Sequence, residues 1–488
     1  MRRIEKIMKG WNFTGENGIK TAVNLPHTWN HKDGQDGGDD YYRSTCIYDC
    51  MVKKPKYTSE EKVYLQFHGV NASAKVIFND KVICVRDGGY STFRMDVTDL
   101  LEEENKLVVE VDNSVNDRVY PQKADFTFYG GIYRDVEFLI VSKEHFDLDY
   151  YGGPGMKYTT EVSGENAKVH VTAYVNEAAK AADCVTKLSL VDAEGKVVSA
   201  AEGSDVTLDV ANVHLWNGLE DPYLYVLKAE LFKDGAVIDT ISCNCGVRYF
   251  EFSPKDGFHL NGRHYPLHGV SRHQDYRDLG NAISVEDHER DMELIREVGA
   301  NTIRLAHYQH DQYFYDLCDK YGMIVWAEIP YISEHLANGN ENTISQMKEL
   351  IVQNYNHSKS NNQNILKDDF GKEDSDCCLH YQNTKELIKE LNLIVSKSDT
   401  SSKYGSQKYS YQSKVFFVVP NQKLKKFLSL NRFENWTFPN LPEDIIIYKN
   451  HSIWLETISH EKIIWIHNEC KEDIEFLKAK NISYYKEK

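Results

Sequence analysis

The sequence predicts a multidomain chain in which β-sandwiches are followed by α/β structure. Up to about residue 247, apolar and polar residues alternate over short segments, which is the period of strands. From Phe258 the spacing changes to alternating strand and helix periods for about 100 residues. At Ser358 the composition changes: only Gly371 and Gly405 of the 29 glycines follow it, with 19 Lys and a single Arg. A length of 488 residues fits three or four domains.

Residues 1–143 are predicted to form the first β-sandwich. Two alternating strands lie within 63–80 around a Gly-Val-Asn-Ala turn, and residues 81–85 and 106–114 add further strands. Short strands separated by turn residues are typical of a sandwich, in which each sheet buries one face.

The pattern repeats in residues 144–248. A strand is expected at 167–176, and hairpins with Glu-Gly and Asp-Gly turns are expected at 186–198 and 225–240. A second block of about 100 residues with these turns predicts an immunoglobulin-like β-sandwich.

Residues 249–357 are predicted to form the first three units of a truncated (β/α)8 barrel. Strand and helix alternate three times, and this order is typical of a parallel sheet or of the start of such a barrel. Strands are expected at 266–273, 301–308 and 323–330, and helices at 284–300, 311–322 and 344–356. Ser284 is the candidate N-cap of the first helix, with Asp287 three residues on and Gly299 near its end.

The C-terminal part has a different character. Residues 358–405 are predicted to be a polar linker that carries a helix at 384–397. Residues 406–488 alternate short apolar strands with Lys-rich segments, and they predict a small α/β module of unknown role.

Bulk properties exclude several functions. The net charge of −17 argues against nucleic acid as a partner. No run of 18 apolar residues occurs, so we expect no membrane-spanning helix. The start MRRIEKIMKGWNF lacks the apolar core of a secretory signal, and the ten cysteines are scattered without paired metal half-sites. We therefore expect a reduced, cytoplasmic protein.

Several strings, taken in order, resemble glycoside hydrolase family 2, the β-galactosidase and β-glucuronidase family. They cover about residues 11–357, and the segment 358–488 is not recognised. The strings are VNLPHTWN (23–30), DGGDDYYRST (36–45), DFTFYGGIYRDV (125–136), LWNGLEDPYLY (215–225), FHLNGRHYPLHGVSRHQD (258–275), NTIRLAHY (301–308) and IVWAEIP (324–330). The resemblance implies that residues 1–143 are a jelly-roll-type, sugar-binding sandwich. The DGGDDYYR form leans towards the β-galactosidase-like members.

The resemblance also implies hydrolysis of a terminal β-linked sugar with retention of configuration. That reaction needs two carboxyl groups about 5 Å apart. In the family both come from barrel strands after the third, and the acid/base is the Glu of an Asn-Glu pair that follows an Asn-His-Pro-Ser motif. Here Asn356-His357-Ser358 is followed by a polar segment that lacks the proline, the apolar strand and the Asn-Glu pair. We therefore expect neither catalytic carboxylate in this region, and we expect the chain alone to be inactive.

One Asn-Glu pair does occur late, at Asn468-Glu469. Glu469 is a candidate acid, but it lies four residues after Trp465 where the family pattern has five. A surface carboxylate at the start of the last helix, where it would favour the helix dipole, explains Glu469 better.

Three residues are expected to contact substrate if the resemblance holds. Asp125 matches the sandwich residue that reaches into the sugar site, although an Asp at this place could also cap a turn. His307, at the end of the second barrel strand, and His335 match family histidines that contact sugar hydroxyls. No cofactor and no metal site are expected.

Other polar residues near the predicted strand ends allow two readings. Arg304 is expected to face the barrel interior, where a charged group needs a carboxylate partner, and Glu328 on the next strand is the candidate. Arg272, His273 and Asp275 follow the first barrel strand. They could shape the pocket or pair with one another.

Three hypotheses remain open at this point. The chain could be a decayed or fused glycosidase, or a carbohydrate-binding or scaffold protein without turnover. It could also be active through Glu469 or with a complementing chain that supplies the missing strands. A β-galactoside-like ligand is expected in each case, and a homo-oligomer is an open alternative.

Overall fold

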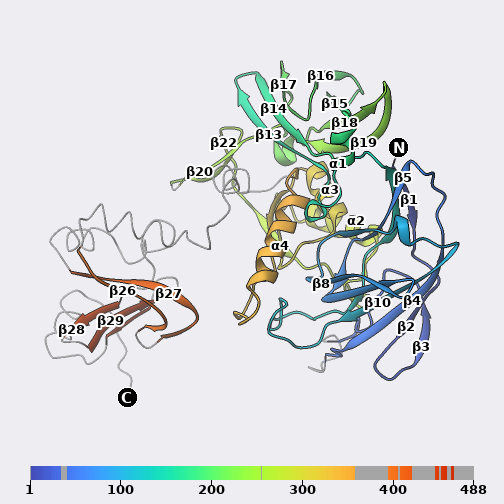
Figure 1. Cartoon of the computed structure of the whole chain (residues 1–488). Coiled ribbons are helices and arrows are strands. Elements are labelled where there is room, and N and C mark those ends of the chain that lie inside the picture. The colour runs from blue at the N-terminus through green and yellow to red at the C-terminus, as the bar shows by residue number, and fades with distance from the viewer. Residues whose placement is uncertain are drawn as a thin grey trace. The chain divides into compact units, whose positions relative to one another are not determined.

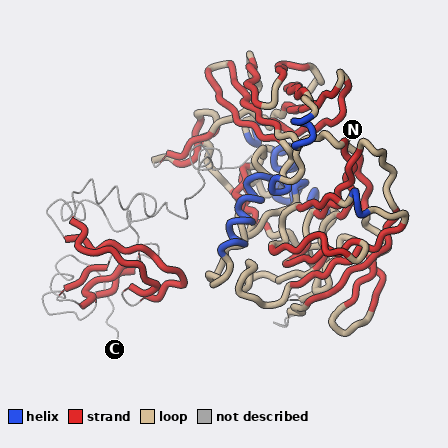
Figure 2. Tube along the Cα trace, viewed as in Figure 1, coloured by secondary structure: helices blue, strands red, loops and turns tan. Residues whose placement is uncertain are grey.

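The structure, a computed structural model, describes residues 2–33, 41–253 and 255–357, together with the backbone of five strands between residues 394 and 466. The chain divides into two compact units, Met1–Asp368 and Asp369–Lys488. Strands predominate in the first unit, and its three longer helices all lie between residues 285 and 353 (Figures 1 and 2). In the described part of the chain, no helix is long and apolar enough to cross a membrane.

Two antiparallel sheets form the first sandwich, as the sequence predicts (Figure 1). The six-stranded sheet runs in the order β3 (Lys20–Val23), β2 (Trp11–Thr14), β4 (Thr45–Lys53), β10 (Glu104–Asp112), β7 (Ser73–Phe78), β8 (Lys81–Asp87). The four-stranded sheet runs in the order β1 (Arg3–Lys6), β12 (Val136–Ser142), β5 (Glu61–Phe67), β9 (Phe93–Asp96). A short pair joins β6 (Val70–Asn71) to β11 (Gly131–Ile132), and a 3-10 turn, η1, spans Thr98–Leu100. β1 precedes the residues in which the sequence predicts strands.

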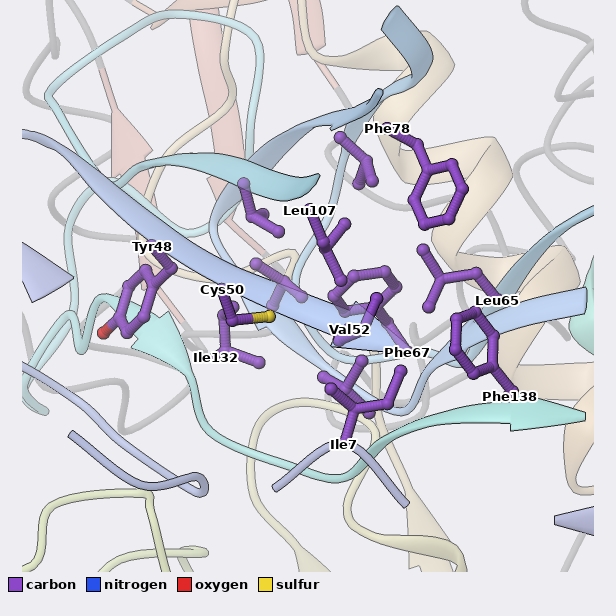
Figure 3. Close-up of a cluster of buried hydrophobic side chains, with 14 of the residues drawn as sticks. Ile7, Tyr48, Cys50, Val52, Leu65, Phe67, Phe78, Leu107, Ile132 and Phe138 are labelled. Carbon is purple, nitrogen blue, oxygen red and sulfur yellow. The ribbon is translucent and has the colours of Figure 1, made fainter. Parts of the chain in front are cut away.

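Alternation along the strands produces the core between these sheets. On β4 and β10 every second residue is buried and its neighbours face solvent, because successive side chains of a strand point to opposite faces. Figure 3 shows the resulting cluster, which includes Ile7, Tyr48, Cys50, Val52, Leu65, Phe67, Phe78, Leu107, Ile132 and Phe138. Complete burial of a large apolar side chain contributes about 1.5–3 kcal/mol.

A three-stranded and a four-stranded sheet make the second sandwich, which fits the immunoglobulin-like prediction. The first sheet contains β13 (Met156–Ser163), β14 (Asn166–Ala173) and β17 (Asp205–Val210). The second contains β16 (Val197–Glu202), β15 (Val185–Val191), β18 (Tyr225–Lys233) and β19 (Ala236–Cys245). The short elements of this part are η2 (Tyr150–Gly152), α1 (Glu177–Ala181) and η3 (Gly218–Glu220).

A small antiparallel sheet leads into a parallel one. The small sheet consists of β20 (Phe250–Ser253), β21 (Gly257–Leu260) and β22 (Arg263–His264). The parallel sheet consists of β23 (Gly269–Arg272), β24 (Thr302–Leu305) and β25 (Ile324–Ala327). Helices alternate with these strands as α2 (Val285–Glu297), α3 (Gln312–Tyr321) and α4 (Asn340–Gln353). The three predicted β/α units are therefore present, with strands shorter than the sequence indicated.

Cap geometry confirms two of the predicted helix ends, whereas α4 begins four residues before the predicted start at 344. The Ser284 side chain accepts from the backbone NH of Asp287, and the Asp287 carboxylate accepts from the NH of Ser284, so α2 begins with a reciprocal capping box. Helix α3 ends at Gly322, whose φ of 77° places it in the left-handed region that glycine tolerates best.

Helix α4 is hydrogen-bonded to residues of the first sandwich. Glu349 accepts a charged hydrogen bond of 2.9 Å from Arg86 and another from the Ser91 hydroxyl. The Gln353 side chain accepts from the backbone NH of Thr92 at 3.0 Å. These buried contacts fix the orientation of the third β/α unit.

The parallel sheet leaves one face uncovered within the described residues. There, β25 pairs only with β24, and Trp326 on β25 is 55% exposed. Tyr331 and Leu267 are also exposed. In a closed barrel this face would point into the packed interior.

The described backbone of the C-terminal unit is all strand. β26 (Ile394–Tyr404) pairs with β27 (Gln407–Val419), and β28 (Ile446–Lys449), β29 (Ser452–Ile458) and β30 (Ile463–Ile466) form a second antiparallel sheet. The apolar segments predicted as strands are therefore strands. β26 lies inside the predicted linker, and its first residues overlap the predicted helix 384–397, whose other residues lie outside the described part.

Candidate active site

Polar side chains gather where the three parallel strands end. His273 follows β23, His307 follows β24 and Glu328 follows β25. Because the carboxyl ends of parallel strands lie at one edge of the sheet, these residues come close together, with the rings of His273 and His307 5.3 Å apart. In (β/α)8 barrels, catalytic groups are placed at this end.

Glu328 holds two of its neighbours in place. Its carboxylate accepts two hydrogen bonds from Arg304, at 2.5 and 3.1 Å, which confirms the predicted partnership. It also lies 2.8 Å from Nδ1 of His307. A carboxylate can only accept, so the proton of the imidazole must be on Nδ1. In the neutral ring, Nε2 is then free to accept a hydrogen bond from a ligand hydroxyl.

Replacing Glu328 with alanine should release the proton of His307 from Nδ1. An Arg304 nitrogen lies 3.0 Å from the same Nδ1 and could donate to it once the carboxylate is gone. We expect ¹⁵N NMR to show protonated Nδ1 in the native chain and a shift towards protonated Nε2 in the variant. Glu251→Ala, on an exposed strand, is the control. An unchanged His307 spectrum in the Glu328 variant would contradict this role.

A loop of the first sandwich completes the site. The Phe126 ring stacks on that of His307, with centroids 5.8 Å apart, and lies 5.0 Å from His273 and 5.6 Å from Tyr308. Asp125, one residue earlier, is exposed. Burial lowers the pKa of His273, while the carboxylates of Asp275 and Asp125 act in the opposite direction. The predicted Asp125 and His307 are therefore brought to the same place.

Aromatic packing makes the base of this site rigid. Tyr308 stacks on Tyr90 of the sandwich, with centroids 4.4 Å apart. The hydroxyl of Tyr129 donates to Asp275 at 3.2 Å. Phe126 and Tyr308 were not among the residues predicted to contact substrate. The aromatic run at 126–129 was the available signal, but its partners lie about 180 residues away in the chain.

His335 lies beyond β25, on the loop that leads to α4. Its Nδ1 is 3.1 Å from the hydroxyl of Tyr331 and 3.5 Å from that of Tyr120. Its role as a sugar contact stays a prediction. Glu469 lies outside the described residues.

Arg272 does not pair with His273 or Asp275. The hypothesis that these residues pair with one another is therefore wrong for Arg272. It is buried and donates to Asp291 at 2.7 Å and to ring nitrogens of His310 and His288 at 3.0 and 3.1 Å. These partners lie on α2 and on the connection between β24 and α3. Arg272 is therefore a structural residue.

Taken together, the arrangement suits recognition of a polyol. It offers an exposed carboxylate, an imidazole nitrogen that can accept, and an aromatic ring beside them. Among the described residues, Glu328 is already engaged by Arg304 and His307, and Asp275 by Tyr129.

Comparisons with known families agree with this architecture. The "Glycosyl hydrolase 2 galactose-binding domain-like" model matches residues 38–149, "Glycosyl hydrolases family 2" matches 155–248, and "Glycosyl hydrolases family 2, TIM barrel domain" matches 254–368. The three matches follow one another in the order of the two sandwiches and the parallel sheet. The chain belongs to glycoside hydrolase family 2.

Curated relatives of this family 2 chain carry two activities in their names. A "Beta-glucuronidase" of Bacteroides fragilis is 36% identical over an alignment of 454 positions that covers 87% of this chain and 63% of the relative. A "Beta-galactosidase" of Thermoanaerobacter pseudethanolicus is 26% identical over an alignment of 429 positions that covers 83% of this chain and 54% of the relative. The chain thus spans roughly half to two thirds of their length. The first match covers more than the residues before Ser358, so it continues into the C-terminal segment.

Similar solved structures also carry the names of β-glucuronidases and β-galactosidases. An "FMN-binding beta-glucuronidase" from Faecalibacterium prausnitzii has a TM-score of 0.71 and 41% identity, over 74% of this chain and 57% of that one. A "putative beta-galactosidase" from Bacteroides fragilis has a TM-score of 0.70 and 33% identity, over 73% and 58%.

Proposed function

We propose that this family 2 chain supplies the sugar-recognition half of a retaining exo-β-glycosidase site and does not hydrolyse glycosides by itself. The observation that supports this is the meeting of Asp125 and Phe126, from the sandwich, with His307 at the strand ends. A terminal β-galactoside or β-glucuronide is the ligand class that the names of the relatives suggest. The engagement of Glu328 by Arg304 and His307, and of Asp275 by Tyr129, supports recognition without turnover.

The roles follow from the chemistry of each group. The Asp125 carboxylate would accept hydrogen bonds from two sugar hydroxyls, and Nε2 of His307 would accept one more. The Phe126 ring would pack against the apolar face of the sugar, which suits an aromatic side chain. Glu328 is a positioning residue, since it acts on the ligand through His307 and Arg304.

Binding and turnover are tested separately. Titration calorimetry with non-hydrolysable thio-β-galactosides and thio-β-glucuronides should detect binding, and nitrophenyl glycosides should give no turnover. Asp125→Ala should weaken binding by roughly 10-fold or more, because a hydrogen bond to a charged group is worth about 1.5–3 kcal/mol. His307→Ala should weaken it by roughly 2- to 10-fold, because a hydrogen bond to the neutral imidazole is worth about 0.5–1.5 kcal/mol. His170→Ala, on the second sandwich, is the matched control and should leave binding unchanged.

Two outcomes would overturn the proposal. Equal binding by the native chain and both variants would place the ligand elsewhere. Robust turnover would show that acid and nucleophile are present, and its loss in Glu469→Gln would identify that residue as one of them. Binding without turnover is also what a pure carbohydrate-binding protein would show; turnover restored by added C-terminal family 2 barrel fragments would favour the half-site.

A further inference from the structure

Three potential metal ligands meet on the far side of the parallel sheet from the sugar site. Asp316 and Asp319 are three residues apart on α3 and therefore lie on one face of that helix. His357 follows the end of α4. Ligand atoms of the three residues all lie within 4.8 Å of one another. The sequence predicted no metal site, since His357 is 38 residues from Asp319.

The geometry of this cluster is that of a partly closed site. Nδ1 of His357 lies 2.6 Å from an oxygen of Asp319 and 4.0 Å from an oxygen of Asp316. The side chains of Asp319 and His357 are 3% and 15% exposed, whereas that of Asp316 is 52% exposed. One side is therefore enclosed, and the other is open for an ion to enter and to keep water ligands.

Both ligand-bearing segments are held by hydrogen bonds to the second sandwich. The backbone oxygen of Asp319 accepts from the buried indole NH of Trp216 at 2.9 Å. Beside His357, the Asn356 side chain accepts from the backbone NH of Tyr158 and donates to the carbonyl of Met156, both at 3.1 Å. Such supports hold ligands near a productive geometry before an ion arrives.

We propose that Asp316, Asp319 and His357 bind a divalent transition-metal ion of the Zn²⁺ class. One imidazole nitrogen and two carboxylate oxygens suit zinc, whereas Ca²⁺ and Mg²⁺ prefer oxygen ligands alone. Zinc bonds of about 2.0–2.2 Å put tetrahedral ligand atoms about 3.3 Å apart. The ligand atoms of His357 and Asp319, now 2.6 Å apart, would separate by about 0.7 Å, and Asp316, being exposed, would close in.

The bound ion would join α3 to the end of α4 and hold both against the second sandwich. The helices of β/α units run antiparallel to the strands, so the C-terminal ends of α3 and α4 lie at the opposite end of the sheet from His307. The inference therefore does not depend on the proposed sugar binding.

The chain contains a matched control for an ordinary ion pair. His214 and Asp221 also lie 2.6 Å apart, and both side chains are 48% exposed. This pair is not part of any three-ligand group in the described residues. Metal binding that depends on Asp316 and His357 but not on His214 would separate a built site from a surface His–Asp pair.

Calorimetry on chelator-treated full chain, titrated with Zn²⁺ alone, tests the proposal. We expect one equivalent bound and a rise in Tm with Zn²⁺ but not with the same concentration of Mg²⁺. Asp316→Asn, at an exposed position that should not disturb folding, and His357→Ala should each weaken Zn²⁺ binding by roughly 10- to 100-fold. His214→Ala should bind as the native chain does.

Three results would overturn the site. They are no stoichiometric binding, unchanged affinity in Asp316→Asn, and an equal loss in His214→Ala. X-ray absorption of the zinc complex should show nitrogen and oxygen ligands. A sulfur shell at about 2.3 Å would instead implicate Cys243, whose thiol is 3.6 Å from the Asn356 side chain, and would refute the assigned ligand set.

Discussion

Replacing Arg134 with methionine is expected to lower the free energy of unfolding of the first unit by about 3–5 kcal/mol. Arg134 is 6% exposed and lies between the sandwich and the parallel sheet. It donates to backbone carbonyls of His68, Tyr90 and Gln309 at 3.2, 2.7 and 2.9 Å. It also donates to the Gln274 side chain at 3.1 Å, and methionine would fill much of its volume but leave these acceptors unpaired.

Urea unfolding measures this effect as a change in midpoint at constant slope. Arg118→Met is the control, because Arg118 pairs with Asp87 at 2.8 Å but is 44% exposed. Exposed ion pairs contribute about 0–1 kcal/mol, so the control should be nearly neutral. Similar losses in the two variants would mean that Arg134 does not hold the interface.

Acid should destabilise the first unit between pH 6.5 and pH 4, before most carboxylates titrate. Burial, with the charge of Arg272 in second place, lowers the pKa of His288 to about 4, and the pKa of buried His310 is also far below its usual value. In this window the unfolded chain binds protons that the folded chain does not, so stability falls as pH falls. At pH 5, His288 alone accounts for about 2 kcal/mol.

Burial, rather than the surrounding charges, sets the direction in which the pKa of His288 shifts. Arg272 and Arg134 oppose a proton on His288, while Asp311 and Asp291 favour one, and burial outweighs them. Unfolding experiments at pH 7 and pH 5 should therefore show a smaller loss in His288→Gln than in the native chain. The exposed His214→Gln should keep the native pH dependence. If the free energy of unfolding changed equally between pH 7 and pH 5 in all three proteins, a role for His288 would be excluded.

The sequence predicted elements well where local signals are strong. Ser284 and Gly322 mark helix ends through their own chemistry, and alternation identified several strands of each sandwich. Arg304 and Glu328 could be paired in advance because a charged group inside a barrel needs a partner, and a carboxylate lies on the next strand.

What could not be predicted depends on contacts between distant residues. Nothing near Phe126 indicates that its ring will stack on His307, and nothing near Arg272 indicates His288 and His310 as partners. β26 was missed because its serine- and lysine-rich sequence resembles a linker. Backbone pairing with the apolar β27 overrides that weak local preference.

The attachment of α4 to the first sandwich has a consequence for the order of folding. Arg86 and Glu349 are 263 residues apart, and Thr92 and Gln353 are 261 apart. Contacts between such distant residues form late, because a long loop must close before they stabilise anything. Many strand pairs of the first sandwich also join distant segments, but the longest loop they close runs only from Arg3 to Ile140. The first sandwich would therefore be complete before α4 docks. The third β/α unit would therefore assemble against an N-terminal domain that has already folded.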